Sequence, residues 1–307
     1  MRAAVLALVG VLMSGCSFQH GSLAGNAVDA ATAVDAEYLD VALSGVDTDS
    51  DGIDDAIDNC VTVANADQFN EDKDDRGDAC DACPHLAGTL TTGDADDDGD
   101  GIGNQCDPRV GTDRRVVFLG FNNATERTAF ALRAGSDQWS VSGGQLHQTD
   151  ATIAVPQNIV WTGETITGTV VAETHVHLDA VPTGTGTRLA AVVGGYYDGT
   201  TVDAYACGLR GSDADVPATV AAWHFVNPPT IGVSSTAATT GTMSAGKEAF
   251  VHLLATDQTT TSTLDCLADA SPLSLAVPSY VPDGYPGFRT LNVTASFDYL
   301  FVVDVGP

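Results

Sequence analysis

The chain has 307 residues, with 41 Asp and Glu against 12 Lys and Arg and a formal net charge of −29. A surface this acidic repels phosphate groups, which argues against nucleic acid as a partner. The length is enough for one large domain or two modest ones.

The first residues are typical of an export signal. Arg2 is the only early charge, residues 3–12 form a short apolar run, and Met13-Ser-Gly-Cys16 follows. Such a run is too short to span a bilayer as a stable helix. Small residues directly before a cysteine resemble the bacterial lipobox, with Met13 where that motif has Leu. The resemblance implies lipidation of Cys16 and an anchor at the outer membrane or cell surface, and a cleaved signal giving a secreted or periplasmic protein is the alternative.

The segment after the signal is expected to be irregular. Residues 17–46 are rich in Ala, Gly, Ser, Val and Asp without a sustained period. Such a composition predicts a flexible tether between the 1–16 signal segment and the folded part. Beyond Cys16 the chain has an even number of cysteines, which in an exported protein predicts disulfides.

The segment 47–107 concentrates the negative charge. It contains 19 Asp or Glu, and its only cations are Lys73 and Arg76, so its net charge is −17. At ~5 Å in water each carboxylate pair repels by roughly 0.8 kcal/mol, and by more once partly buried. We therefore expect bound divalent cations in this segment.

Three twelve-residue windows repeat within the segment, starting at Asp47, Asn70 and Asp96. Each has Asp or Asn at position 1, Asp at positions 3, 5 and 12, and Asp or Asn at position 9. Carboxylates at positions 1, 3 and 5 converge when position 6 lets the chain turn sharply, and a carbonyl at 7 and an acid at 12 complete an oxygen cage suited to calcium. The predicted Ca²⁺ ligands are Asp47, Asp49, Asp51, Ile53, Asp55 and Asp58; Asn70, Asp72, Asp74, Arg76, Asp78 and Asp81; and Asp96, Asp98, Asp100, Ile102, Asn104 and Asp107.

Short motifs within and between the windows resemble those of thrombospondin type 3 repeats. The matching motifs are Asp58-Asn59-Cys60, Asn65-Ala-Asp-Gln68 and Gly77-Asp78-Ala-Cys80-Asp81. The resemblance implies an irregular chain wrapped around calcium ions, with disulfides Cys60–Cys80 and Cys83–Cys106. Asp75 stands where the turn glycine belongs, which puts normal calcium binding by the second window in doubt.

Two other interpretations of this segment remain. An EF-hand or dockerin-like loop pair needs an amphipathic helix on each side of the loop and prefers Glu at position 12. The segment shows no helical period, has Asp at position 12 and has closely spaced cysteines. The second interpretation is a disordered acidic linker, since blocks of like charge are usually solvated. The regular spacing of glycine and cysteine favours the calcium repeats over both.

From 113 to 307 acids are sparse and short β-branched or aromatic runs dominate. Gly, Pro, Asn and Asp separate these runs at intervals typical of an all-β sandwich of ten to thirteen strands. The predicted strands include 116–119, 166–171, 189–193, 249–254 and 297–303. Cys207 and Cys266 lie within strand-like runs, and a bond between them would stabilise the sandwich by roughly 4 kcal/mol.

The two ends of this region resemble the concanavalin A-like or laminin G-like sandwich. The motifs are Phe118-Leu-Gly-Phe121, Trp139-Ser-Val141, Gly287-Phe-Arg-Thr-Leu291 and Ala295-Ser-Phe297-Asp298. The resemblance implies a jelly roll in which the first and last strands lie side by side. The predicted fold is thus mostly β, a jelly-roll sandwich preceded by an irregular, calcium-wrapped and disulfide-linked repeat region.

Catalysis by the glycosidases of this fold requires two carboxylates close together on one face. The region 113–307 has four Glu, and none has another acid within five residues: Glu126, Glu164, Glu173 and Glu248. The close pair Asp213 and Asp215 sits in a loop and is expected to form a turn or a modest calcium site. The chain is therefore predicted not to be an enzyme.

Two further groups have a chemical and a structural interpretation. His175 and His177 alternate on a predicted strand and share a face, as two zinc ligands would, but no third ligand is evident nearby in the sequence. Tyr196-Tyr197 and Trp223-His224-Phe225 could form an aromatic platform for a sugar, although core and edge positions of the sandwich explain them as well.

The sequence therefore predicts a lipid-anchored cell-surface protein. In this interpretation 47–107 is a calcium-ordered stalk that presents the 113–307 sandwich as a binding or adhesion domain for a glycan or a surface protein. A lectin-like carbohydrate-binding protein is the alternative, followed by a divergent glycosidase or lyase.

Overall fold

The computed structural model describes residues 43–88, 95–111, 113–152, 154–184, 186–198, 202–226, 231–256, 261–269, 271–278 and 284–306. The predicted signal segment with Cys16, and the tether up to residue 42, lie outside these residues and stay predictions. In the part of the chain that is described, no helix is long and apolar enough to cross a membrane. Leu43–Pro307 form one compact unit.

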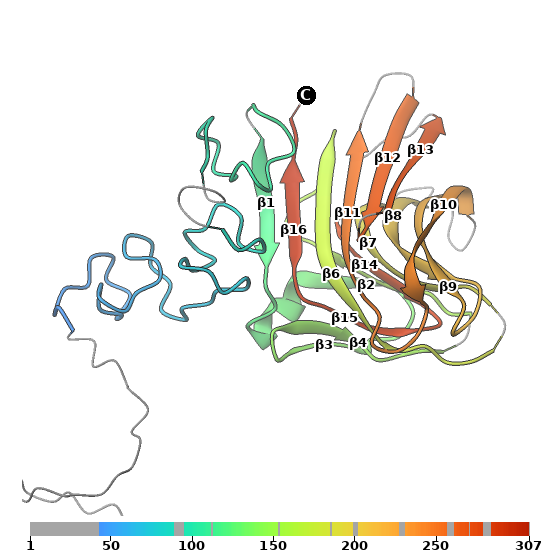
Figure 1. The fold of residues 1–307 in the computed structure, drawn as a ribbon, viewed down its shortest axis with the longest axis horizontal. Coiled ribbons are helices and arrows are strands. Elements are labelled where there is room, and N and C mark those ends of the chain that lie inside the picture. The colour runs from blue at the N-terminus through green and yellow to red at the C-terminus, as the bar shows by residue number, and fades with distance from the viewer. Residues whose placement is uncertain are drawn as a thin grey trace, which may run out of the picture. The chain divides into compact units, whose positions relative to one another are not determined.

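Two antiparallel sheets form the body of this unit (Figure 1). Sheet A has nine strands, in the order β13-β12-β11-β6-β15-β4-β3, with β16 pairing both β6 and β1. Its strands are β1 Arg114–Leu119, β3 Trp139–Ser142, β4 Gln145–Gln148, β6 Val170–Ala180, β11 Glu248–Thr256, β12 Thr261–Ala268, β13 Ser271–Pro278, β15 Thr294–Phe297 and β16 Leu300–Asp304. The first strand thus lies beside the last, as expected for the jelly roll.

Sheet B has seven strands, in the order β10-β9-β8-β7-β14-β5-β2. They are β2 Phe130–Ala134, β5 Gln157–Trp161, β7 Arg188–Asp198, β8 Val202–Gly211, β9 Pro217–Val226, β10 Ile231–Thr242 and β14 Gly287–Leu291. A 3-10 helix, η1 (Ala124–Ala129), precedes β2, and the side chain of Asn123 caps it.

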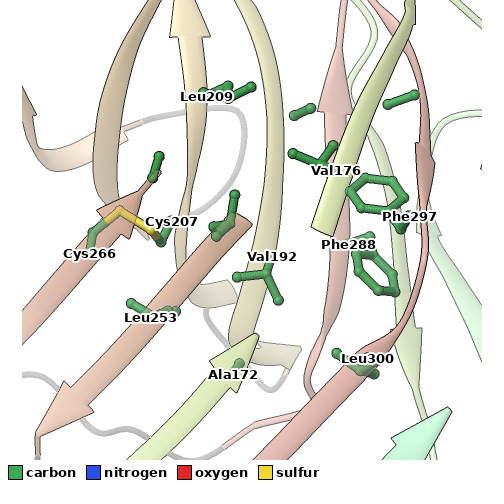
Figure 2. Packing of buried hydrophobic residues seen from close by; sticks show 14 of the residues in the cluster. Ala172, Val176, Val192, Cys207, Leu209, Leu253, Cys266, Phe288, Phe297 and Leu300 are labelled. Carbon is green, nitrogen blue, oxygen red and sulfur yellow. A yellow bond between two sulfur atoms is a disulfide. The ribbon is translucent and has the colours of Figure 1, made fainter. Parts of the chain in front are cut away.

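The core lies between the two sheets and follows the two-residue alternation of the strands. Ala172 and Val176 of β6 face Val192 of β7 (Figure 2). The ring centroids of Phe288 and Phe297 are 4.3 Å apart. Because every second residue of a strand points to the same face, these apolar positions form one continuous layer. The predicted mostly β sandwich is confirmed.

Two predicted strands differ from the observed ones. Ile166 makes only an isolated bridge with Gly284, and β6 begins at Val170. The run 297–303 is divided, because β15 ends at Phe297 and β16 begins at Leu300. Such divisions give sixteen strands in the described residues instead of ten to thirteen.

Three disulfides join the chain in the pairs expected from the sequence. Cys60–Cys80 and Cys83–Cys106 lie in the repeat region, with Cα separations of 5.6 and 5.7 Å. Cys207–Cys266 connects β8 of sheet B to β12 of sheet A across the core (Figure 2). The described part of 47–107 consists of turns and bends, as the resemblance implied.

The repeat region packs directly against the sandwich. The face of sheet A that points away from sheet B carries an apolar cluster of Val171, Phe301 and Val303, and the Cys83–Cys106 disulfide and Ile102 pack into it. Ile102 is fully buried there. The third window therefore packs on the outer face of sheet A, where its apolar side chains are buried against strand residues.

Candidate metal centres

The three acidic windows share one pattern of hydrogen bonds between side chains and backbone. The side-chain oxygen at position 1 accepts from the backbone N–H of position 4 in each window, at 2.7 Å. The carboxylate at position 5 accepts from the N–H of position 7, at 2.7–3.0 Å. The acid at position 12 accepts from the N–H two residues later, at 2.7–3.0 Å. The windows aligned in the sequence thus share these three hydrogen bonds.

Three carboxylates in each window lie close enough to share one ion. In the first and third windows these are positions 1, 3 and 5, with one oxygen of each within 4.8 Å of the others. In the second window the three are Asp72, Asp74 and Asp81, which are positions 3, 5 and 12. Asp58 and Asp107, at position 12 of the other two windows, are not members of these clusters of described carboxylates.

The first window has oxygens that fit a cation. Asp49 Oδ2 and Asp58 Oδ2 are buried and lack a hydrogen-bond partner. Desolvation raises the pKa of Asp49, and the neighbouring carboxylate of Asp51 raises it further. A buried carboxylate oxygen without a donor is unfavourable unless a cation supplies the missing charge. The residues present therefore fit a hard divalent ion with oxygen ligands.

The side chain at position 9 makes the same backbone hydrogen bond in all three windows, and its coordination of an ion stays a prediction. Asp55, Asp78 and Asn104 each accept from the backbone N–H of position 2 of their own window, at 2.8–3.1 Å. In the first window Thr48 Oγ1 also donates to Asp55, so both oxygens of this carboxylate already accept hydrogen bonds. These side chains brace the loop, and they are outside the three clusters of converging carboxylates.

Position 7 was predicted to supply its backbone carbonyl, and the structure shows what its side chain does. Ile53 and Arg76 are partly buried, and Ile102 is the side chain that anchors the third window on sheet A. Arg76 Nη1 donates to the carbonyl of Cys80 at 3.0 Å. Coordination by the three carbonyls stays a prediction.

The second window departs from the others at its turn. Gly52 and Gly101 occupy position 6 with φ of 98° and 91°, and their N–H groups donate to the carboxylate at position 1. Asp75 is at position 6 of the second window and is not among the residues with positive φ. There Asn70 Nδ2 donates to the carbonyl of Asp74 at 2.8 Å instead. The missing glycine therefore changes the turn without removing the carboxylate cluster.

One acid near the third window was not found from the sequence. Asp113 is buried, its N–H donates to Asp100 at 2.8 Å, and its Oδ2 has no hydrogen-bond partner. It lies outside the twelve-residue period, so spacing alone gives no signal for it.

A buried charge cluster joins the repeat region to sheet A. His85 Nε2 lies 2.7 Å from Glu173 Oε2, and His252 Nδ1 contacts the other oxygen of Glu173. Burial alone would raise the pKa of Glu173, but the hydrogen bonds from His252 and His85 outweigh it and lower the pKa to about 2. The His85 ring also packs on the rings of Phe301 and Tyr299, with centroid separations of 4.4 and 4.8 Å. This contact places an ionised carboxylate on the outer face of sheet A.

The two histidines of β6 lie further along the same face. His175 and His177 converge with Asp298, which lies in the break between β15 and β16. The structure thus brings to the two histidines a carboxylate that the sequence did not place beside them. The signal for it was an acid inside an apolar run, but its position depends on the break in the strand.

The aromatic residues considered as a sugar platform gather on the outer face of sheet B. Trp223, Phe225 and Tyr196 form one apolar cluster there, and Arg289 lies 4.5 Å over the ring of Phe225. Trp223 is 1% exposed. His224 instead contacts Asp203 at 2.6 Å. These rings are covered in this structure rather than open to solvent.

The loop pair Asp213 and Asp215 does not form a carboxylate cluster within the described residues. Arg188 lies 3.3 Å from Asp213, and Asp215 takes a positive φ of 57°. Of the two interpretations offered, the turn fits this geometry.

No family model matches the sequence, and no curated protein matches it either. Solved structures are similar in fold at low identity. An endo-1,3-β-glucanase from Streptomyces sioyaensis is 11% identical, with a TM-score of 0.46 over 66% of this chain and 99% of that chain. Basic winged bean lectin with Tn-antigen is 10% identical, with a TM-score of 0.41 over 62% and 98%. The carbohydrate-binding module CBM66 from Bacillus subtilis is 14% identical, with a TM-score of 0.38 over 55% and 92%. These similarities concern the jelly-roll fold alone.

Proposed function

We propose that this chain is an exported calcium-binding protein, in which calcium holds the repeat windows folded against a β-sandwich that binds a ligand without catalysis. One observation carries the calcium part: the three windows repeat the same loop, and in the first of them buried oxygens of Asp49 and Asp58 lack any donor. All side-chain ligands are oxygens, the donor set that calcium prefers.

Calcium would fold this region as well as occupy it. Between residues 43 and 111, the described apolar side chains that are buried are Ile102, Pro84 and three disulfide cysteines, and Ile57, Val61 and Val63 are exposed. Such a segment cannot offset its chain entropy by burial alone. Ion binding supplies the remaining free energy, so loss of calcium should unfold the windows.

The test is calcium removal from the full chain. Chelation should make 47–107 protease-sensitive and change the circular dichroism, with recovery at ~10⁻⁴ to 10⁻³ M calcium, the range of extracellular modules. Asp49→Asn should weaken calcium binding, whereas Asp54→Asn should not, because Asp54 caps Ser44 and Gly45 outside the cluster. If chelation changes neither proteolysis nor circular dichroism, the calcium proposal is wrong.

A glycan is the second part of the proposal, as the ligand of the sandwich. The observation that favours it is the outer face of sheet B, where the partly exposed Tyr285 packs against the buried aromatic cluster and Arg289 lies over the ring of Phe225. Arg289 Nε and Asn158 Nδ2 are buried there without a hydrogen-bond partner. Sugar sites combine aromatic rings with a few such polar groups.

A glycan and matrix-protein screen of the full chain tests this part. Tyr285→Ala should weaken glycan binding at least tenfold, because Tyr285 packs against the aromatic cluster of sheet B and remains partly exposed. His147→Ala, on sheet A, should leave binding unchanged. Binding of a matrix protein without any glycan, or equal binding by the two variants, would exclude a sugar site on this face.

The lipid anchor is proposed from the lipobox resemblance alone. Replacing Cys16 with Ser should move the protein from the membrane fraction to the soluble fraction. Continued membrane association of this variant would exclude the anchor and would leave the calcium and glycan proposals unaffected.

A further inference from the structure

We propose that His175, His177 and Asp298 bind a divalent transition metal of the Zn²⁺ class, at a site separate from the calcium windows. The three ligand atoms are His175 Nδ1, His177 Nε2 and Asp298 Oδ2, which lie within 4.8 Å of one another. Two imidazole nitrogens and one carboxylate oxygen are a donor set that suits zinc, copper or nickel rather than calcium or magnesium.

The distances fit a three-ligand centre. Asp298 Oδ2 lies 2.8 Å from His175 Nδ1 and 2.8 Å from His177 Nε2, and the two nitrogens are 3.2 Å apart. A tetrahedral zinc with bonds of ~2.0–2.1 Å has ligand atoms ~3.3 Å apart. The nitrogens are already at this spacing, and the oxygen needs to move outward by only about half an ångström.

Outer contacts orient the ligands for metal binding. His177 Nδ1 lies 3.2 Å from Glu248 Oε1, so a proton on Nδ1 leaves the lone pair of Nε2 directed at the cluster. Asp298 Oδ1 accepts from Gln145 Nε2 at 2.7 Å, which leaves Oδ2 for the metal. Histidine ligands in metal sites commonly donate their second nitrogen to a carboxylate in this way.

The fold explains why these residues meet. His175 and His177 are two residues apart on β6, so their side chains project from the same face. The break between β15 and β16 places Asp298 beside them, and its backbone N–H donates to the carbonyl of His175 at 3.0 Å. The position of the carboxylate is therefore fixed by the backbone of β6 itself.

The site has an open side. His177 and Asp298 line a pocket of about 520 Å³, together with Gln145 from β4 and Asn70, Glu71 and Lys73 from the second window. The side chains of His175, His177 and Asp298 are 32%, 23% and 20% exposed, so an ion can reach them. Three protein ligands with an open fourth position are typical of zinc sites that bind a further molecule.

A metal-free alternative exists, in which protonated histidines donate to Asp298. The Asp298 and Glu248 carboxylates raise the pKa of His177, the hydrogen bond that His177 donates to Asp298 being the largest contribution. Zinc binding would then release protons, whereas a purely structural cluster would bind no metal. Direct metal binding separates the two.

Zinc titration of the calcium-saturated full chain tests the proposal, because excess calcium occupies the acidic windows. We expect one zinc per chain, at least ~100-fold weaker binding in His175→Ala and in His177→Ala, and ~10–100-fold weaker binding in Glu248→Gln. His147→Ala, on the same sheet, is the matched control and should bind zinc as the wild type does.

X-ray absorption of the zinc-loaded wild type adds a readout that does not depend on whether the variants fold. Two imidazole ligands per zinc would support the site. No zinc binding in the presence of calcium, unchanged affinity in both histidine variants, or an all-oxygen coordination shell would overturn it. Each of these outcomes leaves the calcium test of the windows unaffected.

Discussion

The repeat region and the sandwich differ in what stabilises their folded state. The sandwich buries a continuous apolar layer between two sheets, whereas the repeat region is made of turns whose carboxylates accept backbone hydrogen bonds. Burial of apolar surface stabilises the first without any ligand. The second has a surplus of negative charge, and on the calcium proposal it should become stable only when cations neutralise that charge.

The two regions meet on the outer face of sheet A. There the Cys83–Cys106 disulfide and Ile102 cover apolar strand residues, and His85 reaches the buried carboxylate of Glu173. A region that cannot build its own core thus uses the outside of a neighbouring sheet. The comparison predicts that damage to the sandwich acts independently of calcium, whereas damage to the repeats does not.

Removing the Cys207–Cys266 disulfide should have the largest effect. This bond joins the two sheets across 59 residues of sequence, and its loss should lower the free energy of unfolding by about 4 kcal/mol on the chain-entropy estimate. The double substitution to Ala is measured by urea denaturation followed through tryptophan fluorescence, since all three Trp lie in 113–307. The loss should be the same with calcium and with chelator.

The Cys60–Cys80 pair provides the contrasting measurement. It closes 20 residues within the repeats, so replacing both cysteines with Ala should weaken calcium binding and leave the tryptophan-detected unfolding unchanged. Equal responses of the two pairs to calcium would contradict the separation of the two regions.

His85→Ala should have the next largest effect, because it removes a buried partner of Glu173. The side chain of His85 is fully buried, and Glu173 keeps only His252 when it is gone. Leaving a buried carboxylate without one of its hydrogen-bond partners costs about 3 kcal/mol, and here that loss should appear as faster proteolysis of the repeats at saturating calcium. His147→Ala, a histidine hydrogen-bonded to Ser296 at the surface of the same sheet, should change proteolysis little.

Sequence patterns predicted what is periodic in this protein and missed what depends on chain packing. The twelve-residue windows and the alternation of strand residues are local, so the loop geometry and the sandwich could be predicted. The docking of Ile102 and His85 on sheet A joins residues far apart in the chain, and no spacing encodes it. Asp298 was hidden in an apolar run, because the break that turns it toward His175 is a property of the packed sheet.

Substitutions at position 6 should have a smaller effect on calcium affinity, and the effect should differ between the first and second windows. Gly52 has a φ of 98°, where a side chain is strained, so Gly52→Ala should cost about 1 kcal/mol and weaken calcium binding by the first window about fivefold. Asp75 already has a side chain and no positive φ, so Asp75→Ala should leave the affinity of the second window unchanged. Calcium titration by calorimetry measures both. Equal losses would mean that the two turns have the same conformation in the calcium-bound state.

The smallest effect concerns the pH dependence of stability at the contact between the regions. Burial raises the pKa of Glu126 from 4.5 to about 7, and its Oε2 has no hydrogen-bond partner. A folded-state pKa above the unfolded value means that the folded protein binds the proton more tightly, so this group lowers stability as the pH rises from about 4.5 through 7. Glu126→Gln removes the ionisation, so the urea midpoint of the variant should exceed that of the wild type at pH 8 and equal it at pH 4.5. Glu164→Gln, which alters a partly exposed carboxylate paired with Arg114, should show no such pH-dependent gain.

Because Glu126 lines the same pocket as Asp67 and Asp78, a gain seen only without calcium would mean that the ion, rather than a proton, neutralises this contact in the native protein.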